Sequence, residues 1–385
     1  MKNMVFVLAM VLTATISALA QANQSRIVDL NGVGVPDVTI NETAMCVGVS
    51  HSKTYVTDAN GNFMWPQLGP PPNSGSGSNC AASLVKVFTL KKDGYVFTRD
   101  FFISSPTSLS PYDDRIPLIQ ATTLPTWKIV SAASYRPPTP PLSGNAFFPG
   151  PSPAPAGIAS EMIVAGFGSE LATSTGSAQE PVTTLAGRKI LVKDSAGIEK
   201  SASLFYVSPT QINFLTPEGL ADGPAVFRVI DESDNLIKVG LVEIKKVSHG
   251  IFTANFDGAG PPSAYIVRVK PPNVQVFEPV AEFDEAAQKY VPTLIDHGPE
   301  EDILILVLFG TGWRNASLES SQFWVAEGSG QATMCPINYL GKQPTFLGLD
   351  QANVVLPRSL IGKGEVDLVF NVGAFTARRV RLKFK

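Results

Sequence analysis

A short phrase occurs twice in this chain, and the repeat constrains the fold more than any other feature of the sequence. SPTQINFLTPEG begins at Ser208, and GLDQANVVLPRS begins at Gly348. One constant spacing relates three matching pairs, in which Gln211, Asn213 and Pro217 stand against Gln351, Asn353 and Pro357. A Phe-Gly pair precedes each copy, and a turn with a further apolar run follows it. The sequence therefore predicts two related modules in tandem.

The pattern of apolar runs predicts that both modules are β-sandwiches of the immunoglobulin-like type. From Trp127 onward, short β-branched and aromatic runs are separated by Gly, Asp and Pro; they include MIVAGFG, RKILVKD, AVFRVID, ILILVLFGTG and EVDLVFNV. The 32 glycines and 31 prolines suit tight turns and disfavour long helices. One stretch, EFDEAAQKY, is compatible with a helix, but its longer context FEPVAEFDEAAQKYVPTLID also fits a hairpin.

The repeated Gln-x-Asn element has a structural interpretation and a functional one. Residues two apart on a strand point to the same face, so each pair of amides can bind backbone groups of a neighbouring loop. The proline beyond each asparagine ends its strand, because proline cannot donate to a ladder. The alternative is that the amides contact a ligand. Bracing of loops is the more common use of such side chains. The Phe-Gly pairs predict strand ends at which glycine permits a bend.

The segment 21–105 predicts a separate, smaller module of β-hairpins. Three stretches each alternate apolar and polar residues on both sides of a turn, which predicts three hairpins: IVDLNGVGVPDVTI, KTYVTDANGNFMW and LVKVFTLKKDGYVFTRDFF. The phrases DLNGVGVPDVTI, TDANGNF and KDGYVF resemble the carboxypeptidase regulatory-like (transthyretin-like) domain. The resemblance covers most of this segment and implies an accessory β-sandwich without catalysis. The long loop GPPPNSGSGSNC departs from the compact pattern of that family.

The N-terminus predicts export, which bears on the state of the three cysteines. Lys2 is followed by MVFVLAMVLTATISALA, which predicts a secretory signal peptide cut after Ala20. The alternative is an uncleaved anchor, for which the run is at the short limit. In an oxidising compartment Cys46 and Cys80 can form a disulfide, which leaves Cys335 as an odd, buried thiol. Three free thiols are the open alternative.

From about Trp127 to Lys385 the chain resembles the Solibacter-type uncharacterised C-terminal domain family. The matching phrases are SAASYRP, GFGSELA, LFYVSPTQINFLTPE, GIFTANFDGAG, LFGTGWRN and YLGKQPTFLGLDQANVVLPRSL. The resemblance implies immunoglobulin-like (IPT-like) modules in exported bacterial proteins, and it brings no catalytic residues. The Pro-rich stretch RPPTPPLSGNAFFPGPSPAPAG and His249, where that family has Pro, depart from the pattern.

No reactive motif opposes a non-enzymatic interpretation. The sequence has no GxSxG, HExxH or P-loop, and its three histidines, His51, His249 and His297, are scattered. DANGN, from Asp58, predicts a hairpin turn rather than a calcium loop. We therefore expect no catalytic residue, metal or cofactor. Trp65 and Trp313, near a strand end and in a turn, are the candidates for exposed rings that stack on a ligand; packing in the core is the more common use of Trp.

Together these observations predict an all-β chain of tandem β-sandwiches, one transthyretin-like and two immunoglobulin-like. The expected divisions are a signal peptide (1–20), the carboxypeptidase regulatory-like sandwich (21–105), a linker (106–126), immunoglobulin-like module 1 (127–246) and module 2 (247–385). We expect a cell-surface or extracellular adhesion or binding module whose partner is a protein or a carbohydrate. A net charge of −3 and the lack of a basic cluster disfavour nucleic acid, and no membrane span is expected after cleavage of the signal. The alternatives are a spacer or assembly subunit of an envelope complex and a hydrolase built on loops.

Overall fold

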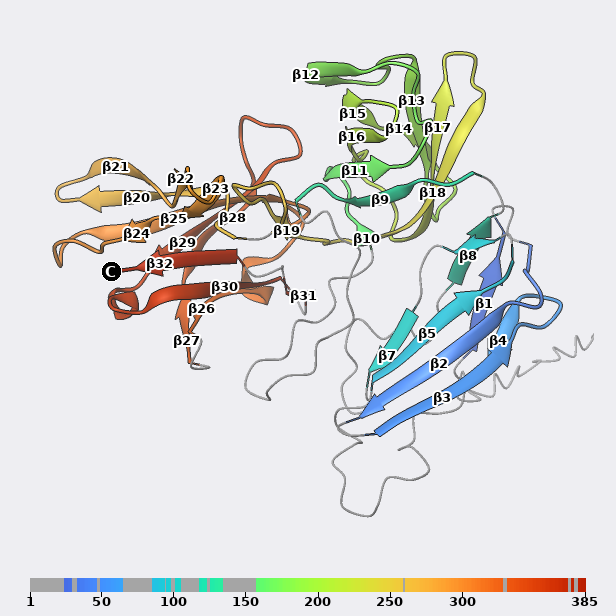
Figure 1. Ribbon diagram of the computed structural model, residues 1–385, viewed down its shortest axis with the longest axis horizontal. Helices are drawn as coiled ribbons and strands as arrows, with labels where there is room; N and C mark the ends of the chain where they lie inside the picture. The colour runs from blue at the N-terminus through green and yellow to red at the C-terminus, as the bar shows by residue number, and fades with distance from the viewer. Residues whose placement is uncertain are drawn as a thin grey trace, which may run out of the picture.

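The protein is an all-β chain of tandem β-sandwiches (Figure 1). The computed structural model describes residues 24–29, 33–46, 49–64, 85–93, 95–97, 101–104, 118–122, 125–133, 157–258, 260–327, 331–372, 375–376 and 380–385. Trp65 and Cys80, and with Cys80 the predicted disulfide to Cys46, lie outside the described residues. Within the described part, no helix has the length and apolar character of a membrane span.

Two four-stranded sheets make up the N-terminal sandwich, with strand orders β4-β1-β8-β6 and β3-β2-β5-β7. Their strands are β1 (Gln24–Val28), β2 (Thr39–Cys46), β3 (Val49–Val56), β4 (Asn62–Met64), β5 (Val85–Lys91), β6 (Val96–Phe97), β7 (Phe101–Ser104) and β8 (Leu118–Thr122). A small core packs between them, built from Ile27, Val35, Val38, Ile40 and Phe63.

The three predicted hairpins of this sandwich are wrong as pairings. The strands of each expected pair, β1 with β2, β3 with β4 and β5 with β6, belong to different sheets. The turn in DANGN is nevertheless present: Asp58 accepts hydrogen bonds from the backbone N–H groups of Asn60 and Asn62, each at 2.8 Å, and Gly61 has a φ of 76°. A turn signal fixes the reversal of the chain, but burial of one face of each strand decides which sheet the strand joins.

The predicted linker 106–126 is wrong for part of its length. Residues 118–122 form β8, which pairs in parallel with β1 and antiparallel with β6. This return strand completes the first sheet of the N-terminal sandwich. A parallel partner distant in sequence leaves no local signal, which is why the sequence did not indicate it.

The second sandwich along the chain, which we call sandwich 1, consists of two five-stranded sheets. Their orders are β12-β15-β16-β11-β9 and β10-β18-β17-β13-β14. The strands are β9 (Lys128–Ser131), β10 (Gly157–Ile158), β11 (Ile163–Phe167), β12 (Gly176–Val182), β13 (Arg188–Lys193), β14 (Glu199–Ser201), β15 (Ser203–Val207), β16 (Gln211–Leu215), β17 (Gly223–Asp231) and β18 (Leu236–Ile244). Its core contains Trp127, Phe214 and Phe227, and the ring of Phe214 contacts the rings of the other two.

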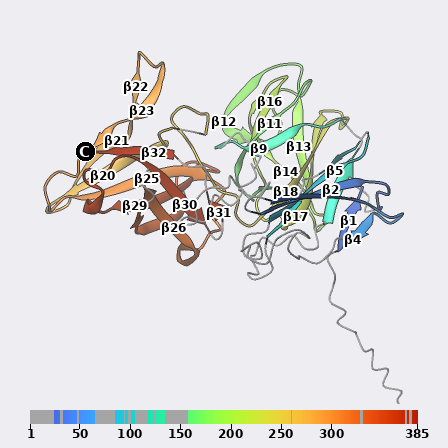
Figure 2. The same cartoon turned by 60° about the horizontal axis from the view of Figure 1, so that its bottom comes forward.

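Sandwich 2 follows, with sheet orders β21-β20-β25-β29-β28 and β24-β32-β30-β26-β27; β19 also pairs with β25, and β31 with β30. Its elements are β19 (Gly250–Ile251), β20 (Ala264–Lys270), β21 (Val274–Pro279), β22 (Ala281–Asp284), β23 (Lys289–Pro292), β24 (Leu294–Ile295), β25 (Ile303–Thr311), η1 (Leu318–Ser320), β26 (Ser321–Ala326), β27 (Ala332–Cys335), β28 (Ile337–Lys342), β29 (Asp350–Leu356), η2 (Arg358–Leu360), β30 (Gly364–Val372), β31 (Phe375–Thr376) and β32 (Val380–Phe384). The hairpin interpretation of EFDEAAQKY is confirmed, because β22 and β23 pair antiparallel and project from the sandwich (Figure 2).

The two larger sandwiches share one strand order. The run β15-β16-β11 in sandwich 1 corresponds to β28-β29-β25 in sandwich 2, and β10-β18-β17-β13-β14 corresponds to β24-β32-β30-β26-β27. Even the short parallel pairs agree, since β10 runs parallel to β18 and β24 runs parallel to β32. The repeated phrase thus occupies the equivalent strands β16 and β29.

A hydrogen-bonded junction joins sandwich 1 to sandwich 2. The hydroxyl of Thr311 accepts from the backbone N–H of Ile163 at 2.9 Å and donates to the carbonyl of Gly348 at 2.8 Å. Oε1 of Glu161 forms ion pairs with Nη1 of Arg314 at 3.1 Å and with Nζ of Lys342 at 3.0 Å. One residue of sandwich 1 therefore holds two cations of sandwich 2.

Candidate functional site

The repeated amides lie on the outer faces of their sheets, where they bind each other. Nε2 of Gln211 donates to Oδ1 of Asn213 at 2.8 Å, and Nε2 of Gln351 donates to Oδ1 of Asn353 at the same distance. All four side chains are half-buried, while the residues between them face the cores. The expectation that these amides bind loop backbone is wrong in both copies. Pro217 and Pro357 follow the ends of β16 and β29, as expected.

The neighbours of the two amide pairs also repeat. Gln211 lies opposite Phe167 of β11, and Gln351 lies opposite Phe309 of β25. On the other side, Asn213 lies opposite Tyr206 and Asn353 lies opposite Tyr339, each next to a register shift. The unit that is duplicated is therefore larger than the phrase: it is an amide pair flanked by a phenylalanine and a tyrosine on adjacent strands.

Other side chains do the loop bracing that was expected of the amides. In sandwich 1 the hydroxyl of Ser208 accepts from the backbone N–H of Gln211 at 3.0 Å. In sandwich 2 the buried carboxylate of Asp350 accepts from the backbone N–H groups of Trp313 at 2.8 Å and Arg314 at 3.1 Å, and pairs with Nε of Arg314 at 2.7 Å. Burial raises the pKa of Asp350, and the Arg314 guanidinium opposes that shift. An acid beside the Gln-x-Asn phrase was the signal available in the sequence.

Trp313 is not an exposed platform. Its side chain is 0% exposed and packs edge-on against Phe370, with ring centroids 5.2 Å apart. A Cβ at Gly310 would lie 2.2 Å from this ring, so the glycine of the Phe-Gly pair makes room for Trp313. The expected exposure of Trp313 is therefore wrong. The expected strand end at this glycine is also wrong in sandwich 2, because β25 continues to Thr311.

The outer face of sheet β21-β20-β25-β29-β28 carries aromatic rings beside the second amide pair, and at its centre Val307 is buried (3% exposed). Tyr265 of β20 lies between Phe277 and Phe309, with ring centroids 5.6 and 5.8 Å away. Phe277 is 63% exposed. The ring of Tyr339 lies over Gly341, where a Cβ would lie 3.1 Å from its hydroxyl, and that hydroxyl donates to the carbonyl of Lys342. We call this surface the platform; it comprises Tyr265, Phe277, Phe309, Tyr339, Gln351 and Asn353.

The equivalent face of sandwich 1 is closed by its neighbour. Its outward residues Val130 and Ala165 are buried in a cluster that Phe252, from the chain leading into sandwich 2, packs against. Gly348 of sandwich 2 lies over the same sheet, where a Cβ would come 2.6 Å from both Ile163 and Leu215. The amide pair is thus duplicated. In sandwich 2 the face beside it exposes Phe277 and Tyr339, by 63% and 37%, although Val307, the equivalent of Ala165, is buried.

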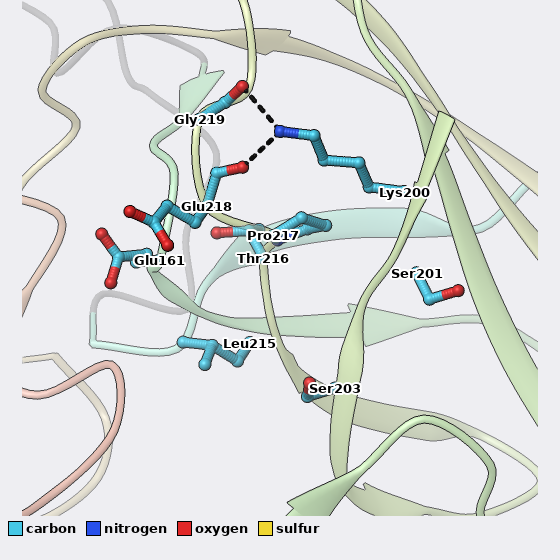
Figure 3. Close-up of a pocket in the computed structure, with 9 residues that line it drawn as sticks. All are labelled: Glu161, Lys200, Ser201, Ser203, Leu215, Thr216, Pro217, Glu218 and Gly219. Atoms are coloured by element: carbon cyan, nitrogen blue, oxygen red, sulfur yellow. Dashed lines mark hydrogen bonds between the residues drawn. The ribbon is translucent and has the colours of Figure 1, made fainter. Parts of the chain in front are cut away.

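A polar hollow of about 710 Å³ lies beside the junction on sandwich 1 (Figure 3). It is lined by Glu161, Lys200, Ser201, Ser203 and the segment 215–219. Nζ of Lys200 reaches across it and donates to the carbonyl oxygens of Glu218 at 2.7 Å and Gly219 at 3.0 Å. The two polar groups best placed to meet a ligand, Lys200 and Glu161, are therefore engaged within the protein.

The titratable groups outside these surfaces serve packing. His249 is buried with Nε2 at 3.2 Å from the carbonyl oxygen of Phe370, and burial lowers its pKa to about 4. His297 is buried too, and burial lowers its pKa. Burial raises the pKa of Cys335 to about 12, as fits the predicted buried thiol. Among the described residues, no group of three His, Cys, Asp or Glu side chains has the geometry to hold a metal ion.

Comparisons with known proteins add little to this geometry. A scan of protein-family models and a search of curated proteins find no match to the sequence. Among solved structures, the chain is similar to the SGBP-B protein of the mixed-linkage glucan utilization locus of Bacteroides ovatus, in complex with a mixed-linkage heptasaccharide. The identity is 8% and the TM-score 0.26, over 95% of this chain and 67% of that one.

Proposed function

We propose that this protein is an exported, non-enzymatic binding protein of the cell surface or extracellular space, and that its platform binds carbohydrate. The observation that carries the proposal is the set of rings, Tyr265, Phe277 and Phe309, on the outer sheet face beside the paired amides of Gln351 and Asn353. Export is supported by the signal peptide that the N-terminal sequence predicts, and the resemblance to an exported immunoglobulin-like family agrees with it.

The chemistry of the platform suits a sugar. Flat aromatic rings present apolar surface to the C–H faces of pyranose rings, and Tyr adds a polar tip. Side-chain amides offer both donors and acceptors, which match hydroxyl groups. Each amide pair forms one internal hydrogen bond. The remaining N–H and C=O groups of Gln351 and Asn353 can therefore bind a ligand. The row from Tyr265 across Val307 and Asn353 to Tyr339 crosses four strands, a span of roughly 14 Å at the usual strand spacing.

A matched pair of variants tests this proposal. Full-length protein is run through native gels that contain soluble polysaccharides, and retardation is compared for the wild type, Gln351→Ala, Tyr265→Ala and Gln211→Ala. We expect at least one polysaccharide to retard the wild type, with retardation lost in Gln351→Ala and Tyr265→Ala. The Gln211→Ala variant removes the same amide in sandwich 1 and should behave like the wild type. Equal loss in Gln211→Ala, or no retardation across the panel, would refute the proposal.

A second candidate function, an assembly subunit that pairs through strand edges, is favoured by β21. This edge strand exposes Val274 (56%) and Val276 (37%), and unpaired edge strands accept an added strand from a partner. Pull-downs from envelope fractions with the wild type and with Val276→Pro distinguish the two functions. A co-purifying protein that is lost with Val276→Pro, together with blank glycan gels, would favour the assembly role.

A further inference from the structure

The platform differs from an ordinary protein surface in its charge. Its outward positions on the five strands are all described, and none carries a charged side chain: they are Gln275, Phe277, Pro279, Tyr265, Val267, Val269, Ile303, Ile305, Val307, Phe309, Gln351, Asn353, Val355, Tyr339 and Gly341. The opposite face of the same sandwich is ordinary, because Glu365, Asp367, Arg381 and Lys383 point outward from β30 and β32, and Arg381 forms ion pairs with Glu365 and Asp367.

Two cations near the platform are already paired within the protein. Lys342, at the end of β28, is bonded to Glu161 across the junction at 3.0 Å. Arg268 of β20 turns to the other side of its strand, where it is bonded to Glu278 at 2.5 Å and to Asp302 at 3.1 Å. Proteins recognise carboxylate, sulfate and phosphate groups with arginine and lysine, often in bidentate pairs. The platform offers no such partner.

From this surface, and on the basis of the proposed function, we infer that the ligand of the platform is an uncharged polysaccharide. An acidic sugar placed over Tyr265 and Phe309 would lose water from its carboxylate and gain no cation in return. A neutral sugar loses only hydroxyl hydration, which the amides of Gln351 and Asn353 replace. The absence of charge thus selects against uronic-acid and sulfated glycans, while the rings and amides provide the attraction.

The test uses full-length protein in native gels that contain neutral polysaccharides (a glucan, a xylan and a mannan) or anionic ones (alginate and polygalacturonate). We expect retardation by one or more neutral polymers, unchanged when salt is raised, and none by the anionic polymers. The variant Gln351→Glu keeps the size of the side chain. Its carboxylate can accept a hydrogen bond from the side-chain N–H of Asn353, which replaces the native hydrogen bond between the two amides. It should weaken neutral binding by about tenfold, because it adds a charge to be desolvated. Gln211→Glu, the matched change in sandwich 1, should leave binding unchanged.

The contrary outcomes distinguish failure of the neutral-ligand inference from failure of carbohydrate binding itself. Retardation by anionic polymers alone, abolished by Tyr265→Ala, would overturn the inference of a neutral ligand and leave carbohydrate binding by the platform in place. A blank panel would overturn both. Neutral binding that survives both Gln351→Glu and Tyr265→Ala would place the sugar elsewhere and also overturn both. Size-exclusion chromatography showing a dimer that Tyr265→Ala converts to a monomer would mean that a second copy of the chain covers this face, and would likewise overturn both.

Discussion

Sandwich 1 and sandwich 2 share their strand order, their amide pair and the aromatic neighbours of that pair, yet they use these shared parts differently. In sandwich 1 the outer face is closed by Phe252 and Gly348, and the loop beside the phrase is held by a serine hydroxyl. In sandwich 2 the outer face exposes Phe277 and Tyr339, and the loop is held by the buried pair of Asp350 and Arg314. Duplication therefore kept the backbone frame, and divergence occurred where the copies meet each other and the solvent.

The tryptophans make the same point inside the cores. In each sandwich an indole packs against a glycine of equivalent strands, at Gly166 of β11 for Trp127 and at Gly310 of β25 for Trp313. Trp127 enters from the chain before β9, whereas Trp313 enters from the loop after β25. Because Gly310 matches Gly168 of the other Phe-Gly pair, the two indoles contact glycines two positions apart. Both copies therefore place a tryptophan ring on this strand, but from different positions in the sequence.

The largest difference between the sandwiches should appear on removing Asp350. Asp350→Ala leaves Arg314 buried without its main partner and leaves two loop N–H groups unbonded, which should cost about 3–5 kcal/mol in the free energy of unfolding of sandwich 2. The corresponding change in sandwich 1, Thr210→Ala, should cost under about 1 kcal/mol. Urea denaturation followed by tryptophan fluorescence measures both. Equal costs would show that the two loops are held alike.

Acid should weaken sandwich 2 before sandwich 1, which has no histidine between residues 127 and 246. Burial holds His249 neutral with a pKa of about 4, while an unfolded histidine binds its proton near 6.5. The unfolded state therefore gains protons first, so stability is full above pH 6.5 and falls as pH drops toward 4, by about 3 kcal/mol from His249. The lowered pKa of His297 acts in the same direction.

Unfolding titrations between pH 7 and pH 4.5 test this dependence. His249→Phe keeps a ring against Phe370 and removes the titrating group, so its stability should depend less on pH than that of the wild type. A wild-type stability that stays constant over this interval would contradict the burial of a neutral imidazole.

The two amide pairs should contribute equally to folding. Gln211→Ala and Gln351→Ala each remove one half-buried hydrogen bond of 2.8 Å, so each should cost about 1 kcal/mol. Thermal unfolding measures the two costs side by side. A cost at Gln211 several times that at Gln351 would show that closure of the face in sandwich 1 had turned its amide pair into a core element.

The smallest expected effect concerns the junction. Glu161→Ala removes partly exposed ion pairs to Arg314 and Lys342, a loss of about 0.5–1 kcal/mol, while the bonds of Thr311 and the packing of Gly348 remain. Small-angle scattering of Glu161→Ala should show the two sandwiches in nearly the same arrangement as in the wild type. The double variant Thr311→Val with Glu161→Ala should show a wider range of arrangements. A large change with Glu161→Ala alone would make the ion pairs the principal link.

Sequence patterns predicted several long strands of the two larger sandwiches, among them β11, β13, β17, β25 and β30, because each is a short β-branched or aromatic run bounded by Gly, Asp or Pro. The repeat of Gln-x-Asn with its proline predicted equivalent positions for β16 and β29, and the strand orders confirm them. Local turns were also predictable, as Asp58 and Gly61 show. What failed was non-local: the sheet that each N-terminal strand joins, and the parallel return of β8, depend on burial across the sandwich rather than on neighbouring residues.

The candidate site was only half predictable. The sequence singled out Gln351 and Asn353 but assigned them to loop bracing, and it selected Trp313, which lies in the core. Tyr265 and Phe309 come from strands that the sequence indicated, whereas Phe277 lies on β21, which it did not. The meeting of the three rings on one face depends on the register of β21, β20 and β25. Register across strands cannot be read from any one of them, and so the platform emerged only from the structure.

The central claim is that the platform of sandwich 2, and not the closed face of sandwich 1, contacts a neutral glycan. Selective labelling of glutamine with nitrogen-15 places both copies in one spectrum, and the Gln351→Glu and Gln211→Glu variants assign the two side-chain amide signals. On adding the polysaccharide fragment selected by the gels, the Gln351 amide should shift and the Gln211 amide should stay in place. A shift of the Gln211 amide alone, or of neither, would contradict the account.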